Sequence, residues 1–243
     1  MSQSSLEPVA LLLSGGLDSA ILLGHLLEQG RPVHPLYIQS GLHWQGAELQ
    51  AVKTFLAALA SPRLQPLTVL ELPLSDVYGQ HWSVQGRGVP GEQTPDEAVY
   101  LPGRNLLLTV KPAIWCRLHG VEELALGVLG SNPFSDASDA FFRLVCATVE
   151  QAVGGRFEIL RPFAHLHKVD VMRLGAELPL EFTFSCIDPQ GSLHCGHCNK
   201  CAERKTAFAD AGLPDRTAYA TAPAPAGNGQ LQRLNVSQSH PPR

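Results

Sequence analysis

The segment from Ser14 to Ser19, read as SGGLDS, has the composition of a phosphate-binding turn. Its two glycines allow a tight turn and let backbone N–H groups approach an anion with no Cβ in the way. A helix that begins at Leu17 would point its first N–H groups, and the positive end of its dipole, at the same anion. The spacing differs from the Gly-x-x-x-x-Gly-Lys-Ser/Thr turn that holds β- and γ-phosphates.

Asp18 is the unusual member of this turn, because a carboxylate beside bare phosphate would be repelled. Its presence makes sense if it reaches Mg²⁺ or anchors the turn. The alternative is a plain turn in which Asp18 is only an acid at the start of a helix. The strand-turn-helix context favours phosphate binding. The residues expected at the nucleotide are Leu13, Ser14, Gly15, Gly16, Leu17, Asp18 and Ser19.

Four cysteines near the carboxyl end are spaced x8, x2 and x2. A Cys-x2-Cys pair brings two thiolates to one metal ion, and four sulfur ligands form a closed tetrahedral zinc site. We therefore expect a structural zinc ion, with an iron–sulfur cluster as the alternative. A closed site leaves no position for substrate. The predicted ligands are Cys186, Cys195, Cys198 and Cys201.

Composition limits the classes of partner. The chain has 243 residues, a net charge of −4 and no cluster of Lys and Arg, so direct binding to nucleic acid is not expected. Its apolar runs are far shorter than the ~18 residues of a membrane span, and its start does not resemble a signal peptide. We expect a cytoplasmic protein with reduced thiols and a small-molecule partner. The sequence leaves association into a homodimer open.

Short apolar runs alternate with segments of helical spacing, which predicts a parallel sheet with helices on both faces. In such sheets ligands bind beyond the carboxyl ends of the strands. The informative loops are then those after Leu13, Gln39, Leu72 and Leu129. The expected strands are Val9–Leu13, Val33–Gln39, Leu67–Leu72, Glu123–Leu129 and Phe157–Leu160. The expected helices are Leu17–Gly30, Gly46–Ala60, Pro102–His119, Ser138–Val153 and Lys168–Glu177.

Other segments are less regular. Residues 75–99 predict irregular structure, and Pro112 should kink its helix or mark a boundary. From Thr183 to Lys205 the composition shifts to Cys, His and Gly, which suggests a metal-bound appendage. The tail from Ala220 to Arg243 lacks apolar periodicity, and we expect it to be disordered. The predicted division is an α/β nucleotide-binding domain at 1–182, a zinc subdomain at 183–219 packed on it, and the tail at 220–243.

Four separate segments together resemble one enzyme family. They are SGGLDS at the turn, LPGRN at 101–105, FSC at 184–186 and HCGHCNKCAER at 194–204. The turn is similar to the PP-loop of ATP pyrophosphatases, and the whole set is similar to the 7-cyano-7-deazaguanine synthase family, also called the QueC family. The resemblance runs from about Val9 to about Tyr219.

This resemblance implies a Rossmann-like adenine-nucleotide hydrolase fold, ATP, Mg²⁺ and a four-cysteine Zn²⁺ site. It also implies a reaction in which 7-carboxy-7-deazaguanine and ammonia become the 7-nitrile through adenylated intermediates, with ATP consumed. That product is a precursor of the modified tRNA bases queuosine and archaeosine. The implied partners are therefore a deazapurine carboxylate and ammonia.

Residue roles follow from the same resemblance. Asp18, Arg104 and Lys168 are the expected catalytic residues, the two cations neutralising phosphate charge. Isolated Arg and Lys side chains are more often solvated surface groups, which is the competing interpretation. Asn105 and Asp136 are expected to make polar contacts with the substrate. Phe134 and Trp44 are expected to stack on it, although both could equally be loop residues buried for packing. The expected substrate-binding residues are Trp44, Arg104, Asn105, Phe134 and Asp136.

Two loops depart from the pattern of the family, at residues 40–45 and 132–138. Both should lie at the carboxyl ends of strands, where the substrate would bind. These departures raise the hypothesis that the chain is a divergent branch of the family. An alternative function is then a ligase that joins a deazaguanine-type carboxylate to a different amine, such as a peptide. Further alternatives are a tRNA-thiolating enzyme, for which no reactive cysteine or basic RNA-binding domain is evident, and a non-catalytic module that binds zinc and ATP.

Overall fold

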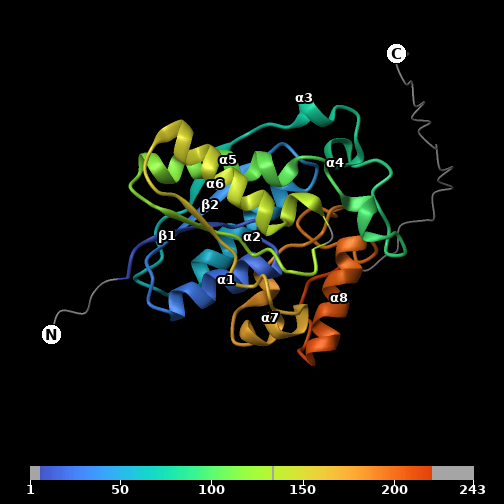
Figure 1. The fold of residues 1–243 in the computed structure, drawn as a ribbon. Helices are drawn as coiled ribbons and strands as arrows, with labels where there is room; N and C mark the ends of the chain where they lie inside the picture. The colour runs from blue at the N-terminus through green and yellow to red at the C-terminus, as the bar shows by residue number, and fades with distance from the viewer. Residues whose placement is uncertain (1–5, 133, 221–243) are drawn as a thin grey trace, which may run out of the picture.

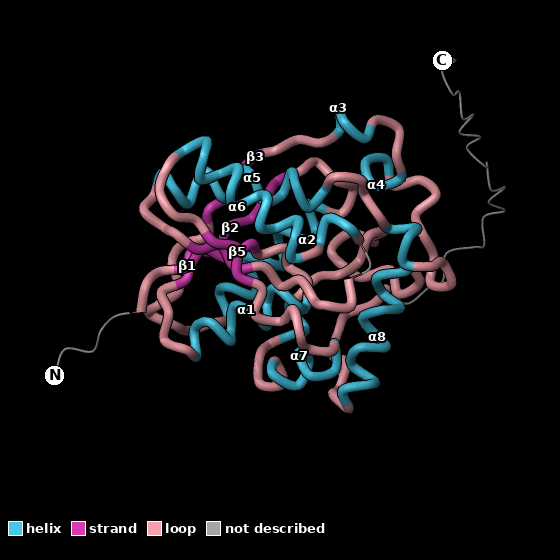
Figure 2. The backbone as a smooth tube through the Cα atoms, viewed as in Figure 1, coloured by secondary structure: helices cyan, strands magenta, loops and turns pink. Residues whose placement is uncertain are grey.

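The computed structural model describes residues 6–132 and 134–220. Five parallel strands form one sheet in the order β3-β2-β1-β4-β5 (Figures 1 and 2). The order reverses between β1 and β4, because the chain first builds outward to β3 and then returns to the other side of β1. The strands are β1 (Val9–Leu12), β2 (Val33–Gln39), β3 (Thr68–Glu71), β4 (Glu123–Ala125) and β5 (Glu158–Leu160).

Helices cover both faces of the sheet, as the sequence predicted (Figure 1). Val9 and Leu11 of β1 face a core shared with α1, α2, α7 and α8, whereas Ala10 faces a second core shared with α5 and α6. This alternation follows from the two-residue period of a strand. The helices are α1 (Leu17–Glu28), α2 (Gln45–Ala58), α3 (Ser75–Tyr78), α4 (Trp82–Gln85), α5 (Arg104–Leu118), α6 (Asp139–Val153), α7 (Lys168–Leu174) and α8 (Asn199–Ala211).

The cysteine-rich segment contacts the sheet domain at the phosphate turn. The backbone N–H of Phe184 donates to the carbonyl of Gly15 at 2.7 Å, and that of Asn199 donates to Pro90 at 2.9 Å. The four cysteines share a small apolar cluster with Leu42 and Trp44, which follow β2. The segment therefore forms part of the wall above the sheet.

The structure refines two local expectations: Pro112 does not mark a helix boundary, and the irregular segment at 75–99 contains short helical turns. Helix α5 continues through Pro112, which is buried beside Ala113 and close to Cys116, so core packing holds the helix on both sides of the missing N–H donor. Residues 75–99 contain the one-turn helices α3 and α4 and a 3-10 turn at Asp96–Val99. Two further 3-10 turns occur at Ser135–Ala137 and Leu180–Phe182.

Strand β4 ends at Ala125 instead of Leu129, because its last partner in β5 is Leu160 and the chain then turns toward α1. Beyond Ala220, the tail expected to be disordered lies outside the described residues. Within the described part of the chain, no helix is long and apolar enough to cross a bilayer.

Candidate functional site

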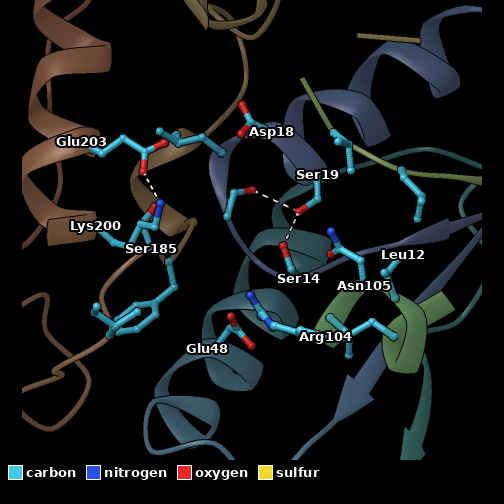
Figure 3. Close-up of a pocket in the computed structure, with 18 of the residues that line it drawn as sticks. Leu12, Ser14, Asp18, Ser19, Glu48, Arg104, Asn105, Ser185, Lys200 and Glu203 are labelled. Atoms are coloured by element: carbon cyan, nitrogen blue, oxygen red, sulfur yellow. Dashed lines mark hydrogen bonds and ion pairs between the residues drawn. The ribbon is translucent and has the colours of Figure 1, made fainter. Parts of the chain in front are cut away.

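A cavity of about 310 Å³ opens at the carboxyl ends of β1 and β4 (Figure 3). This is the point at which the strand order reverses, where open α/β sheets bind ligands. The volume lies at the lower end of the range for small-molecule sites. Residues from the phosphate turn, α2, α5, α7, α8 and the cysteine-rich segment line it. The charged lining residues are Asp18, Glu48, Arg104, Lys168, Lys200, Glu203 and Arg204.

The phosphate turn presents donors to this cavity. Helix α1 has Gly16 as its N-cap residue and no side-chain cap, so its first N–H groups have no partner within the helix. Gly15 adopts φ +81°, a left-handed conformation that favours glycine. The hydroxyls of Ser14 and Ser19 lie 3.2 Å apart, and that of Ser19 donates to the carbonyl of Gly16 at 3.2 Å. Such a turn can bind an anionic oxygen.

Gly127 sits directly after β4 and touches the same turn. A Cβ built on Gly127 would lie 2.9 Å from the carbonyl carbon of Asp18 and from the nitrogen of Ser19. Both are backbone atoms, so a flexible side chain could not move away to relieve the contact. The end of β4 and the start of α1 can approach this closely only because residue 127 lacks a side chain.

Asp18 forms an ion pair with Lys168 across the cavity. The ammonium lies 2.7 Å from one carboxylate oxygen and 2.9 Å from the other. Lys168 is the first residue of α7, and Asp18 is in the first turn of α1, so the pair ties the two helices together. In this arrangement Asp18 anchors the turn, and its charge beside the anion site is compensated.

On the opposite side of the cavity, Arg104 and Asn105 begin α5 after a left-handed Gly103 with φ +73°. The Nε of Arg104 is buried and has no hydrogen-bond partner among the described residues. Asn105 has partners: its Nδ2 donates to the carboxylate of Asp136 at 3.2 Å and to its carbonyl at 3.1 Å. Both residues line the cavity; the Nε of Arg104 is buried without a partner, whereas Asn105 is held by Asp136.

Glu48 lies one turn into α2, beside Gly15. Its carboxylate accepts a hydrogen bond of 2.7 Å from the hydroxyl of Tyr37, in β2. Burial raises the pKa of Glu48 to about 7, although the hydrogen bond from Tyr37 and the charge of Arg104 act in the opposite direction.

Helix α8 contributes an ion pair and a buried arginine to the cavity lining. Lys200 donates to Glu203 at 2.6 Å. Burial alone would raise the pKa of Glu203, but the charge and hydrogen bond of Lys200 hold it below the usual value. The guanidinium of Arg204, whose residue is only 1% exposed, donates to hydroxyls and to one carbonyl. Its acceptors are Thr183, Ser185, Thr217 and the carbonyl of Leu180.

The structure does not bring every predicted residue into the cavity. Trp44 lines it, with its ring stacked on Trp82 at 5.8 Å. Leu13 has its side chain in the core below the sheet. Phe134 stacks on Tyr100 at 4.6 Å, away from the cavity lining. Asp136 is buried and holds Asn105, so it acts on the cavity through that residue.

The four predicted metal ligands converge. Their Sγ atoms all lie within 4.8 Å of one another, including 3.8 Å between Cys186 and Cys198 and 3.9 Å between Cys195 and Cys201. Four sulfurs at ~2.3 Å from a tetrahedral ion would be about 3.8 Å apart, so the spacing fits one ion of this kind. Backbone N–H groups of Asp188 and Cys195 donate to the sulfur of Cys186 at 3.3 and 3.2 Å, which suits a thiolate.

Sequence reasoning missed several lining residues. Glu48 follows Trp44 by one helical turn, a spacing that could have pointed to it. Arg204 is the last residue of the HCGHCNKCAER segment at 194–204, but the resemblance to the family assigned it no role. Ser185 lies in the FSC segment at 184–186 but was assigned no role, and Gly127 carried no signal in the sequence, because its proximity to the turn arises from the sheet order. Of the four loops expected to be informative, those after Leu72 and Leu129 contribute nothing to the cavity lining, because the lining residues that follow β4 are Leu126, Gly127 and Val128.

Comparison with known proteins places the chain in a family. The family model described as "Queuosine biosynthesis protein QueC" matches residues 9–212. A protein of Syntrophobacter fumaroxidans named 7-cyano-7-deazaguanine synthase is 32% identical over 237 residues, which covers 90% of this chain and 99% of that protein. One of the same name from Xanthomonas campestris pv. campestris strain B100 is 30% identical over 233 residues, covering 88% and 99%.

A solved structure of a 4-thiouridine synthetase with RNA and bound ATP has a TM-score of 0.47 at 15% identity, covering 84% of this chain and 50% of that chain. The family model spans most of this chain, and the two synthases align over nearly their whole length. The chain therefore belongs to the QueC family of queuosine biosynthesis proteins.

Proposed function

We propose that this chain converts 7-carboxy-7-deazaguanine and ammonia to 7-cyano-7-deazaguanine, using ATP to activate the carboxylate. Membership of the QueC family and the names of the two relatives support the substrate and the product. The observation that carries the nucleotide part is the uncapped start of α1, which opens on a cavity at the reversal point of the sheet.

The phosphate turn would bind the diphosphate that leaves ATP. Its N–H groups, the Ser14 and Ser19 hydroxyls and the dipole of α1 are donors of fixed position, which stabilise charge without reorganising. Arg104 would add positive charge from the cavity lining, and Lys168 lies beside the turn in its pair with Asp18. The substrate carboxylate would then approach the α-phosphorus in line with the departing group.

Activation is needed because a carboxylate is a poor electrophile and hydroxide is a poor leaving group. Adenylation produces a mixed anhydride that ammonia can attack to give an amide. A second activation, at the amide oxygen, would allow dehydration to the nitrile. The work of the protein is then mainly positioning and charge stabilisation, worth several kcal/mol in favourable cases.

Two metals belong to this proposal. Mg²⁺ would enter with ATP and neutralise phosphate charge. Zn²⁺ would be held by Cys186, Cys195, Cys198 and Cys201, which are 0–3% exposed and would leave no coordination position open. Its contribution would be to the stability of the wall that carries Phe184 and Ser185.

The test is incubation of the purified protein with ATP, Mg²⁺, 7-carboxy-7-deazaguanine and ammonium, followed by mass spectrometry. We expect the nitrile, AMP and diphosphate, each dependent on the acid. Parallel reactions with a peptide amine in place of ammonium separate the alternative ligase. Formation of ADP and orthophosphate without AMP would refute the proposal.

A further inference from the structure

Three carboxylates line the cavity, and two of them are neutralised. Asp18 is paired with Lys168 at 2.7 Å, and Glu203 with Lys200 at 2.6 Å. Glu48 has no salt-bridge partner within 4.0 Å among the described residues; its carboxylate accepts a hydrogen bond from the hydroxyl of Tyr37, and Trp44 and the more distant charge of Arg104 also stabilise its charged form. The described lining residues include neither His nor Cys. Among the three lining carboxylates of the described chain, Glu48 is thus the one without an ion pair within 4.0 Å.

The position of Glu48 is fixed from two sides. The Cγ of Glu48 lies 3.2 Å from where a Cβ of Gly15 would be, so the phosphate turn rests against this side chain. Figure 3 shows the carboxylate of Glu48 and the guanidinium of Arg104 pointing toward one another, next to Ser14. A carboxylate and a guanidinium therefore share the part of the cavity nearest the turn.

The protonation states are suited to proton transfer. Burial raises the pKa of Tyr37 far above its ordinary value, with further increases from the charge and hydrogen bond of Glu48, so this hydroxyl stays a donor. Burial raises the pKa of Glu48 to about 7. A base with a pKa near the working pH combines a usable charged fraction with enough basicity to accept a proton.

We propose that Glu48 accepts the proton that the nitrogen must lose when ammonia attacks the adenylated acid, with Tyr37 orienting its carboxylate. This inference rests on the function proposed above. The nitrogen lone pair forms the C–N bond, the bond from carbon to the phosphate oxygen breaks, and AMP leaves with that electron pair. One N–H bond breaks, its electrons stay on nitrogen, and the proton moves to an Oε of Glu48.

The same group serves the second half of the reaction. After activation of the amide oxygen, the nitrogen still carries two protons: loss of one gives a neutral adenylated imidate, and loss of the other, with AMP leaving with the electron pair of the C–O bond, forms the C≡N bond. Glu48 accepts these two protons in turn, and it releases each proton to solvent before it accepts the next. One base therefore suffices for both steps, because each step removes protons from the same nitrogen.

The test compares two rates in Glu48→Gln. Exchange of labelled diphosphate into ATP, measured with the acid but without ammonium, reports adenylation, in which the carboxylate attacks and no base is needed. Amide and nitrile formation report the later steps. We expect the ratio of amide formation to exchange to fall ~10²–10⁴-fold, the usual contribution of a general base. An equal loss of both rates, or no loss, would overturn the assignment of Glu48.

A second variant, Tyr37→Phe, tests the role of Glu48 through the pH dependence of amide formation. Deprotonated Glu48 is the active form, so the amide-forming rate of the wild type should rise with pH through about 7. Tyr37→Phe removes a hydrogen bond that lowers the pKa of Glu48, so this rise should move to higher pH. Glu158→Gln, a matched change at the edge strand β5, should leave the profile unmoved. An unshifted profile in Tyr37→Phe would contradict the inference.

The two proposals fail differently. If the wild type shows neither exchange nor AMP formation with the acid, the function itself is wrong. If the wild type makes nitrile and Glu48→Gln makes amide with an unchanged ratio, the function stands and only the proton acceptor is misassigned. Melting temperatures of all variants identify any loss caused by unfolding.

Discussion

Replacing Gly127 with Ala should displace the phosphate turn, although residue 127 is not part of that turn. The added Cβ would meet the carbonyl carbon of Asp18 and the nitrogen of Ser19 at 2.9 Å, and the carbonyl oxygen of Asp18 at 3.1 Å. All three are backbone atoms of the first turn of α1. Either β4 or α1 must move, and the phosphate turn leads directly into α1.

The size of the effect follows from these distances. The closest contacts are about 0.5 Å shorter than ordinary van der Waals separation. Overpacking of this kind costs about 1–3 kcal/mol of stability. Because misplacement by ~1 Å can reduce turnover ~10²-fold, a shift of half that size predicts a loss of roughly tenfold. The melting temperature should fall by about 2–4 °C per kcal/mol for a chain of this length.

The assay is acid-dependent release of diphosphate, with the melting temperature measured on the same samples. Gly46→Ala is the matched control, because a Cβ at Gly46 meets nothing within 4 Å and the residue lies inside α2. It should keep full activity and gain up to ~1 kcal/mol from helix propensity. Wild-type turnover and stability in Gly127→Ala would show that the approach of β4 to α1 does not determine the geometry of the turn.

Three further predictions concern the turn and the cysteine-rich wall. Cys198→Ser should lower zinc content, measured by elemental analysis, and the melting temperature together, because a structural zinc site contributes directly to folding. Asp18→Ala should abolish turnover while lowering stability by only ~1 kcal/mol or less, since its pair with Lys168 is partly exposed. Arg204→Lys should lower stability by roughly 2–4 kcal/mol in a denaturant titration, because a lysine cannot reproduce the fork that reaches Thr217 and the other buried acceptors.

Each of these has an outcome that contradicts it. A stable, zinc-replete Cys198→Ser protein would remove the structural role of the metal. Unchanged turnover in Asp18→Ala would show that this carboxylate has no catalytic role. A denaturation midpoint at the wild-type value in Arg204→Lys would mean that the buried fork does not hold the wall. Cys146→Ser, on α6 and outside the cluster, is the control for thiol replacement.

The elements of the fold could be predicted where the pattern was local. Val33–Gln39 and the start of α1 at Leu17 were predicted to the residue, since an apolar run and a glycine turn mark them. The predictions for strand β4 and helix α5 were less accurate. The end of β4 depends on its pairing with Leu160, and the continuity of α5 through Pro112 depends on core contacts from α6. Neither partner is near in the sequence.

The candidate site shows the same division. The cysteine ligands and the Ser-Gly-Gly turn could be found because their chemistry lies within a few residues of chain. The pairing of Asp18 with Lys168 joins positions 150 residues apart, and the partner of Asn105 proved to be Asp136. Such contacts are set by the strand order, on which local periodicity carries no information.

The sequence by itself determined that a glycine turn of a kind that can bind anions opens a helix after a buried strand and that four thiols are spaced for one metal. Only the tertiary structure decided that Gly127 presses against this turn, that Arg204 is buried behind it, and that Glu48 alone among the lining acids has no cation partner within 4.0 Å among the described residues. The physical reason is that backbone turns and ligand spacing are properties of neighbouring residues. Charge pairing and close approach depend instead on which distant segments the folded core brings together.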